Sequence, residues 1–268
     1  MIFADTHTHL YLEEFDHDRE MAVRNAIDKG VNYFFLPNID SGSISGMLAL
    51  ADTFPGHCFP MMGLHPTSVK GNYREELAIV EKELADQSKR YFAIGEVGID
   101  LYWSKEFESC QLSAFSFQLD LAVKYDLPVV IHTRNSFDVA IDVIEKKNNP
   151  AIRGIFHCFG GSLKQAEKAI ELGFKLGIGG IITYKNSGLQ KVVEVVGLEN
   201  LVLETDSPFL PPVPYRGQRN ESVYIPIIAQ KISEIKDISI DAVAQITTIN
   251  ALKVFNFNPS SPLPLINS

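Results

Sequence analysis

The stretch IFADTHTH, residues 2–9, joins a short apolar run to two histidines. An amphipathic segment at residues 16–29 follows it, and a second apolar run begins after Gly30, at residues 31–36. Strand, polar turn, helix and strand in this order make one unit of a parallel α/β sheet. We expect Gly30 to end the helix in the left-handed conformation, which glycine adopts without a Cβ penalty.

This alternation continues along nearly the whole chain. We predict eight strands, at residues 2–4, 31–36, 58–62, 91–94, 128–131, 154–156, 174–178 and 201–203. Helices are expected between and after them, among others at residues 16–29, 75–87, 108–125, 136–147, 162–172, 189–196, 221–235 and 239–255. Eight such units close into a barrel, whereas six would favour an open doubly wound sheet. The sequence therefore predicts an α/β protein with a single (β/α)8 TIM-type barrel at residues 1–257 and a frayed tail at residues 258–268.

Length and composition agree with one barrel. At 268 residues and 46% hydrophobic content, the chain can fill one large core. Three scattered cysteines without a C-x-x-C spacing favour a reduced, cytoplasmic setting. The N-terminus has no basic segment followed by an apolar run of the kind found in signal peptides, and no stretch of about 18 consecutive apolar residues could span a membrane. We expect a soluble protein with no membrane association and no obligate protein partner.

Histidines and acids follow five of the predicted strands, and barrel strands converge with their carboxyl ends on one rim, where active sites lie. These side chains should therefore meet. They are His7, His9, Glu96, His132, His157 and Asp206. By contrast, His17 and His57 fall outside strand ends and are expected to be ordinary surface residues.

The pair His7 and His9 can bind one ion, because side chains at i and i+2 of an extended backbone point the same way. Two core histidines satisfied by carbonyls would give the same pattern, but four further ligand-type residues on the rim favour a metal. Imidazole and carboxylate donors without a thiolate suit Zn, Mn, Ni, Fe or Mg. Glu96, between the histidine groups in strand order, is the candidate bridge between two ions. Its alternative is a buried glutamate paired with an arginine.

Three neighbours of these residues have other expected roles. Cys158, adjacent to His157, should point to the opposite side and pack. Glu204 is expected to orient a histidine through an N–H bond, with metal ligation as the alternative. His65 ends the third strand, and we expect it to contact substrate instead of a metal.

The chain closely resembles the TatD family of metal-dependent deoxyribonucleases over almost its whole length. The matching motifs are DTHTHL (5–10), GLHP (63–66), GEVGID (95–100), LP (127–128) with IHTR (131–134), FHCF (156–159) and ETDSP (204–208). Two positions depart from the family pattern, Gly160 in place of serine and Ser222 in place of proline. Since neither touches a proposed ligand, they bear only on loop shape and substrate preference.

The resemblance also implies how two ions are shared. One metal would be held by His7, His9 and Asp206, the other by His132 and His157, with Glu96 bridging. Two divalent ions (Mg, Mn or Zn) about 3.5–4 Å apart can lower the pKa of a shared water and neutralise charge on phosphoryl oxygens. We therefore predict a hydrolase of ester bonds, a deoxyribonuclease of exonuclease type, with Glu96 and Asp206 as catalytic residues and Asp206 as the general base.

A DNA or other phosphodiester substrate would need cations at the mouth, because the formal charge of the chain is −9. Residues 207–217 contain four prolines and are expected to form an ordered loop over this face. Expected phosphate contacts come from strand-end regions and this loop: Arg134, Lys185, Arg216 and Arg219. Loop aromatics would either stack unpaired bases or roof the pocket: Tyr102, Trp103 and Tyr184.

Two alternatives remain open from the sequence. The same rim could polarise the carbonyl of an amide, a lactone or an ester. Many such barrels bridge their metals with a modified lysine, whereas here the fourth strand leads to Glu96 and no lysine stands directly at a strand end, which favours the nuclease branch. A catalytically idle barrel acting as a binding protein is the other alternative, and the complete ligand set argues against it.

Overall fold

The structure, a computed structural model, describes residues 1–257, so the tail expected at residues 258–268 lies outside the described residues. Its strands are short and mutually parallel: β1 (Phe3–Asp5), β2 (Val31–Leu36), β3 (Cys58–Pro60), β4 (Ile94–Asp100), β5 (Val129–Arg134), β6 (Gly154–Phe156), β7 (Phe174–Ile178) and β8 (Leu201–Leu203). Neighbours in space follow chain order, first β1 to β3 and then β4 to β8.

Two junctions close these strands into a barrel. Met62, just past β3, forms a parallel bridge with Ile94 of β4. At the other junction the amide of Thr6 donates to the carbonyl of Leu203 at 2.9 Å, which joins β1 to β8. Each strand therefore has two neighbours, and the predicted (β/α)8 barrel is confirmed.

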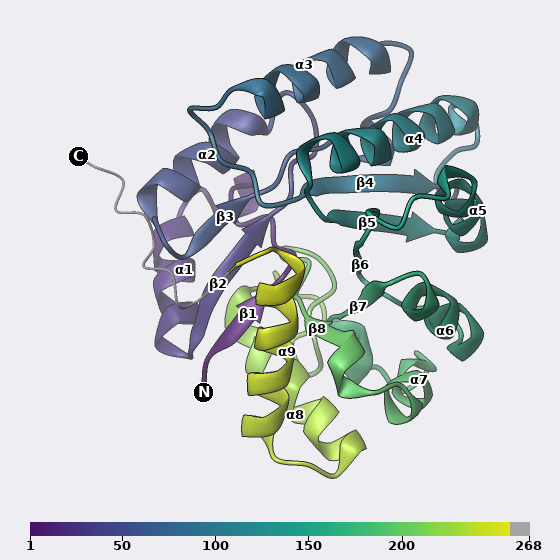
Figure 1. Ribbon diagram of the computed structural model, residues 1–268. Coiled ribbons are helices and arrows are strands. Elements are labelled where there is room, and N and C mark those ends of the chain that lie inside the picture. Colours follow the sequence, from purple (N-terminus) through teal and green to yellow (C-terminus); the bar gives the residue numbers. More distant parts are fainter. Residues whose placement is uncertain (258–268) are drawn as a thin grey trace.

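Helices surround the barrel, as Figure 1 shows. They are α1 (Arg19–Asp28), α2 (Ile44–Thr53), α3 (Tyr73–Ala85), α4 (Glu108–Tyr125), α5 (Phe137–Lys147), α6 (Leu163–Glu171), α7 (Leu189–Val195), α8 (Ile225–Lys236) and α9 (Ile240–Val254). Gly30 follows α1 with a φ of 90°, as expected for a residue that ends a helix in the left-handed region. Within residues 1–257, none of these helices has the length and apolarity needed to cross a membrane.

The sequence prediction misplaced the fourth strand and ended the fifth too early, since β5 runs to Arg134 and contains His132. We expected the fourth strand at residues 91–94, with Glu96 beyond its end, but β4 spans Ile94–Asp100 and contains Glu96. The two glycines that flank this glutamate look like a turn in the sequence. At Gly98 the reason is a close approach, since a Cβ there would lie 2.1 Å from the carbonyl oxygen of His132.

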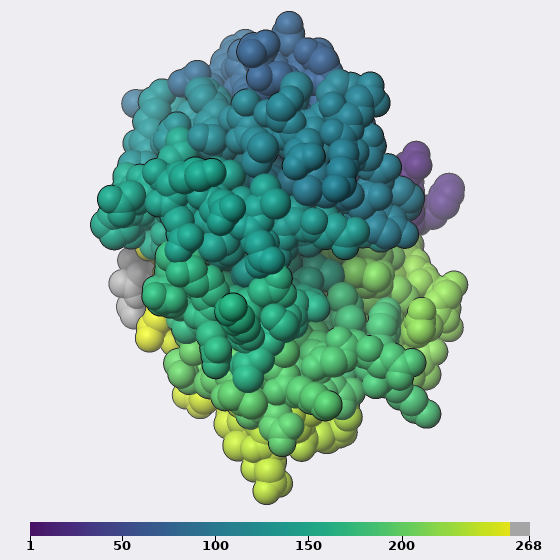
Figure 2. All heavy atoms as spheres, turned by 90° about the vertical axis from the view of Figure 1, so that its right-hand side faces the viewer, coloured from purple at the N-terminus to yellow at the C-terminus, as the bar shows by residue number. Residues whose placement is uncertain are grey.

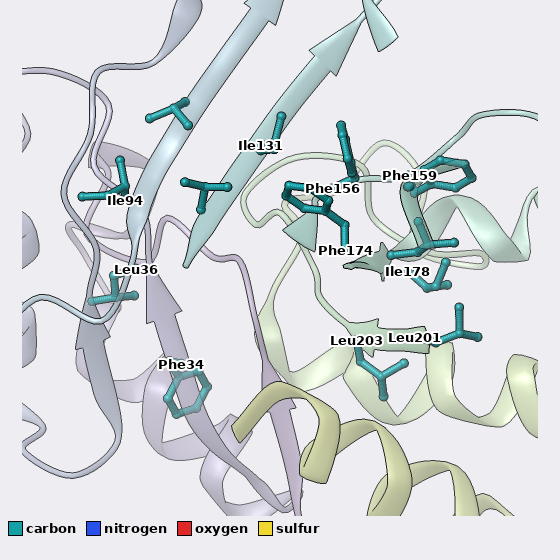
Figure 3. Packing of buried hydrophobic residues seen from close by; sticks show 14 of the residues in the cluster. Phe34, Leu36, Ile94, Ile131, Phe156, Phe159, Phe174, Ile178, Leu201 and Leu203 are labelled. Atoms are coloured by element: carbon teal, nitrogen blue, oxygen red, sulfur yellow. The ribbon is translucent and has the colours of Figure 1, made fainter. Parts of the chain in front are cut away.

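The strands bury side chains on both faces. Phe34, Leu36, Ile131 and Phe156 belong to the layer that packs against the helices, drawn in Figure 3. The second cluster lies inside the barrel. Among the described residues it consists of Ala4, Phe35, Phe59, Met61, Ala93, Val130, Ile155 and Val202, together with Ala251 of α9 and Phe255 just past that helix. At its base the ring of Phe255 stacks on Phe35 with centroids 3.7 Å apart.

The residues of this interior cluster show that the side chains of the candidate site point into the barrel. Side chains two residues apart on a strand share a face, so His132 follows Val130 into the barrel and His157 follows Ile155. Glu204 follows Val202 in the same way. Aromatic residues close one end of the barrel, and polar residues occupy the end toward which the strands run.

Candidate metal centre

Hydrogen bonds join the segments that follow β1 and β8, and they bring three of the proposed ligands close to one another. The amide of Asp206 donates to the carbonyl of His7 at 2.9 Å. Thr8 bridges Ser207 through the backbone, and their hydroxyls lie 2.6 Å apart. The Nε2 atoms of His7 and His9 consequently lie 3.2 Å apart, and Asp206 Oδ1 is 3.6 Å from the first and 3.7 Å from the second.

Glu96 stands between two histidine pairs. Its Oε2 lies 3.0 Å from His7 Nε2 and 3.5 Å from His9 Nε2. Its Oε1 lies 2.9 Å from His132 Nδ1 and 2.8 Å from His157 Nε2. One carboxylate oxygen thus faces each pair, which is the placement expected of a carboxylate shared by two ions.

The donor set fits divalent cations. Within residues 1–257, the ion-pair partners of Glu96 are all histidines, so the alternative of a glutamate paired with an arginine finds no support. Three groups of donors are close enough to hold an ion: His7, His157 and Asp206; His7, His9 and Glu96; His65, Glu96 and His132. All the donors are nitrogen or oxygen atoms, which suits Mg, Mn or Zn.

The charges within the cluster are compatible with a bound divalent ion. Burial alone would raise the pKa of Glu96, but the facing imidazoles of His157, His65 and His7 outweigh it and hold that pKa well below its usual range. Burial raises the pKa of Asp206 to about 6, although His157 and His9 act in the opposite direction. The imidazoles thus already supply positive charge to this buried carboxylate, and a divalent ion held by their neutral forms would supply it in their place.

His65 lies closer to the cluster than we expected. Its Nε2 atom is 3.2 Å from Glu96 Oε1, and it belongs to one of the groups that could hold an ion. The imidazole is fixed from the other side, because its Nδ1 accepts from the amide of Thr67 at 3.1 Å. With Nδ1 accepting, the neutral ring carries its proton on Nε2, so His65 is arranged to donate to Glu96 or to a substrate, and ligation of an ion would require the other tautomer.

Sequence reasoning missed Asp100, which is 3% exposed at the end of β4. Its Oδ2 lies 3.1 Å from His132 Nε2, the ring nitrogen opposite the one that faces Glu96. The usual partner of a ligating imidazole's second nitrogen is such a carboxylate. Alternation along β4 could have found it, because residues 96, 98 and 100 share one face.

Glu204 and Cys158 lie beside His157. Glu204 Oε1 is 3.6 Å from His157 Nδ1, too long for a hydrogen bond, and accepts from the amide of Cys158 at 2.5 Å. Cys158 lies beyond the end of β6 with a φ of 45°. Strand alternation therefore cannot place its side chain, and our reason for expecting it to pack on the opposite side does not hold.

The expected phosphate contacts divide into two groups. Arg134, Lys185 and Arg216 are exposed, and Arg134 and Arg216 lie over the rings of Tyr102 and Tyr184. In contrast, Arg219 donates to both carboxylate oxygens of Asp18 at 2.7 Å and to Glu221 at 2.9 Å. A phosphate would have to displace two carboxylates there, so this geometry gives no support to Arg219 as a substrate contact.

One departure from the TatD pattern reaches the neighbourhood of the ligands. Ser222 is buried, and its hydroxyl lies 3.2 Å from that of Thr8, between His7 and His9 in the chain. It touches no proposed ligand, in agreement with the sequence reading.

Comparison with known proteins agrees with this geometry. A model of the family described as TatD related DNase matches residues 4–256. An uncharacterized metal-dependent hydrolase of Bacillus subtilis, YabD, is 34% identical and aligns over 96% of this chain and 100% of its own. The crystal structure of YjjV, a TatD homolog from Escherichia coli, superposes with a TM-score of 0.90 at 31% identity, covering 96% of this chain and 98% of that one. A lactonase from Deinococcus radiodurans shares the fold alone, with a TM-score of 0.66 at 14% identity and coverage of 94% and 95%. This chain is a metal-dependent hydrolase and belongs to the TatD family.

Proposed function

We propose that this protein hydrolyses phosphodiesters, with DNA as substrate and release of nucleotides from a strand end. The observation that carries the proposal is Glu96, whose two oxygens each face one histidine pair at 2.8–3.5 Å. Two divalent ions bound there, Mg, Mn or Zn, would lower the pKa of a shared water and neutralise charge on the phosphoryl group.

The chain's own residues have separate tasks in this proposal. Asp206, whose Oδ1 lies 3.6 Å from His7 Nε2 and 3.7 Å from His9 Nε2, accepts the proton of the attacking water. His65 contacts the phosphate beside Glu96. The exposed side chains of Arg134 and Lys185 bind flanking phosphates and offset the formal charge of −9.

One substrate panel tests the proposal. The metal-reconstituted enzyme is offered single-stranded DNA, duplex DNA, RNA, a small phosphodiester, a lactone, an amide and a carboxylic ester. Glu96→Gln, prepared in the same way, controls for a contaminating nuclease. We expect hydrolysis of the phosphodiesters only. Turnover of a lactone or amide with none of a phosphodiester would overturn the proposal in favour of carbonyl chemistry.

Two further measurements refine it. Circular and linear single strands of one sequence separate cleavage from an end, which spares the circle, from internal cleavage, which does not. Metal content without any turnover on the panel would favour the idle binding protein instead. The cytoplasmic setting remains a prediction from the cysteines, which are all free in the structure.

A further inference from the structure

We propose that Tyr102, Trp103 and Arg134 form a subsite that stacks an unpaired nucleobase beside the metal centre. The inference rests on the proposed phosphodiesterase function and adds where the strand is held next to the reacting phosphate. It concerns a surface outside the ligand cluster, formed by the segment after β4 and the end of β5.

The aromatic rings of this subsite are exposed to an unusual degree. Trp103 is 71% exposed and Tyr102 is 52% exposed, whereas the large aromatic side chains of the core are almost fully buried. The two rings meet edge to face, with centroids 4.9 Å apart. A ring packed over the pocket would be covered by neighbouring side chains. The exposure of Trp103 therefore favours a surface that is available to bind a ligand.

Arg134 adds charge to the same surface. Its guanidinium carbon lies 3.9 Å from the Tyr102 centroid and 5.1 Å from the Trp103 centroid. Arginines also stack on Phe54 and Tyr73, but those rings are only 6% and 7% exposed. In the described part of the chain, Arg134 has no ion-pair partner, which leaves its guanidinium available to a phosphate.

Asp100 places this subsite next to the metal centre. Its Oδ1 accepts from the amide of Tyr102 at 2.9 Å, while its Oδ2 lies 3.1 Å from His132 Nε2. Arg134 is two residues from His132 on β5, and its carbonyl accepts from the amide of Leu101 at 2.9 Å. The aromatic surface and a proposed ligand therefore share one carboxylate.

Figure 2 shows the face toward which β4 and β5 point in Figure 1, and this face is hollowed where the blue, teal and green segments meet. The segment after β4 begins at this face, because β4 ends there at Asp100. Stacking on an aromatic ring is sequence-tolerant because every base has a π-face, so the subsite would select unpaired bases without selecting their identity.

The chain itself provides the probe, since Trp103 is its only tryptophan. The metal-loaded enzyme is titrated with an uncleavable phosphorothioate single strand and with an abasic strand of equal length and charge. We expect saturable quenching of Trp103 emission by the strand that carries bases, and binding of the abasic strand weaker by roughly 5- to 150-fold. Equal affinities and equal quenching would overturn the subsite and leave only charge attraction.

Variants make the test independent of fluorescence, with a labelled strand followed by anisotropy. Trp103→Leu and Arg134→Gln should weaken binding, whereas Trp103→Phe should retain most of it because phenylalanine can still stack. Arg90→Gln is the matched control, because Arg90 lies 4.7 Å from the centroid of Phe92, which packs at the closed end of the barrel. Binding that is unchanged in Trp103→Leu, or lowered equally in Arg90→Gln, would overturn the proposal.

Wild-type turnover of a small phosphodiester separates this inference from the function on which it rests. If the enzyme hydrolyses that substrate but does not distinguish the two strands, the subsite fails and the phosphodiesterase function stands. If no phosphodiester is hydrolysed, the proposed function fails, whatever Trp103 reports.

Discussion

Replacing Asp100 by asparagine should weaken metal binding at His132 without removing a ligand. The carboxylate accepts from the amide of Tyr102 through Oδ1 and faces His132 Nε2 through Oδ2 at 3.1 Å. It thereby favours the tautomer with the proton on Nε2, which leaves the Nδ1 lone pair directed at Glu96. Asparagine has only one acceptor oxygen. If that oxygen remains hydrogen-bonded to the Tyr102 amide, the asparagine NH₂ group faces His132 Nε2. The imidazole proton then moves to Nδ1, where it prevents this nitrogen from binding a metal.

We expect metal affinity to fall by about 10- to 100-fold, because removing the carboxylate partner of a ligating histidine typically costs that much. Calorimetric titration of metal into the metal-free protein measures it. We expect the affinity of one site to fall by that factor, and the site of His7, His9 and Asp206 to stay within about threefold of wild type, because it shares only Glu96 with the altered side.

Gln111→Leu is the structural control for this experiment. Gln111 is buried and bonds both the amide and the carbonyl of Asp100, yet it makes no contact with His132. Its loss should lower thermal stability and leave metal affinity near wild type. The positioning role of Asp100 would be refuted if Asp100→Asn bound metal at both sites with wild-type affinity. It would also be refuted if Gln111→Leu lost as much metal affinity as Asp100→Asn.

Three further predictions concern the site and the barrel. His65→Ala should lower turnover or substrate affinity while metal stoichiometry stays near wild type by elemental analysis, and loss of one equivalent would make His65 a ligand. Asp206→Asn should lower kcat by about 10²–10⁴-fold with incomplete rescue by excess metal, because an amide cannot accept the proton; full rescue would make Asp206 a ligand only. Phe255→Ala should destabilise the fold by about 3–5 kcal/mol in denaturant unfolding, because its ring fills the closed end of the barrel, and a loss below about 1 kcal/mol would contradict that packing.

The sequence predicted most strands well because a parallel barrel strand is an apolar run with a polar end. Residues 31–36, 154–156, 174–178 and 201–203 match β2, β6, β7 and β8. β4 was misplaced because two glycines and an acid look like a turn in one dimension. Only the structure shows that Gly98 allows close approach to β5 and that Glu96 points at histidines from two other strands.

Most of the candidate site could be predicted from the sequence, as most of the strands could. Strand ends in a barrel converge by topology, so the six proposed ligands could be grouped without coordinates. Arg219 shows the limit, because its partner Asp18 is 201 residues away and no local pattern reveals that pair. Asp100 was missed for a different reason: the predicted fourth strand ended at residue 94, and alternation reaches residue 100 only along the observed β4.

Metal content measured together with activity tests the central claim most directly. The purified chain should bind about two divalent ions, lose phosphodiester hydrolysis on chelation, and regain it with Mg, Mn or Zn. Glu96→Gln should hold the ions more weakly, because its bridging oxygen loses its charge. A metal-free protein with full hydrolytic activity would contradict the account.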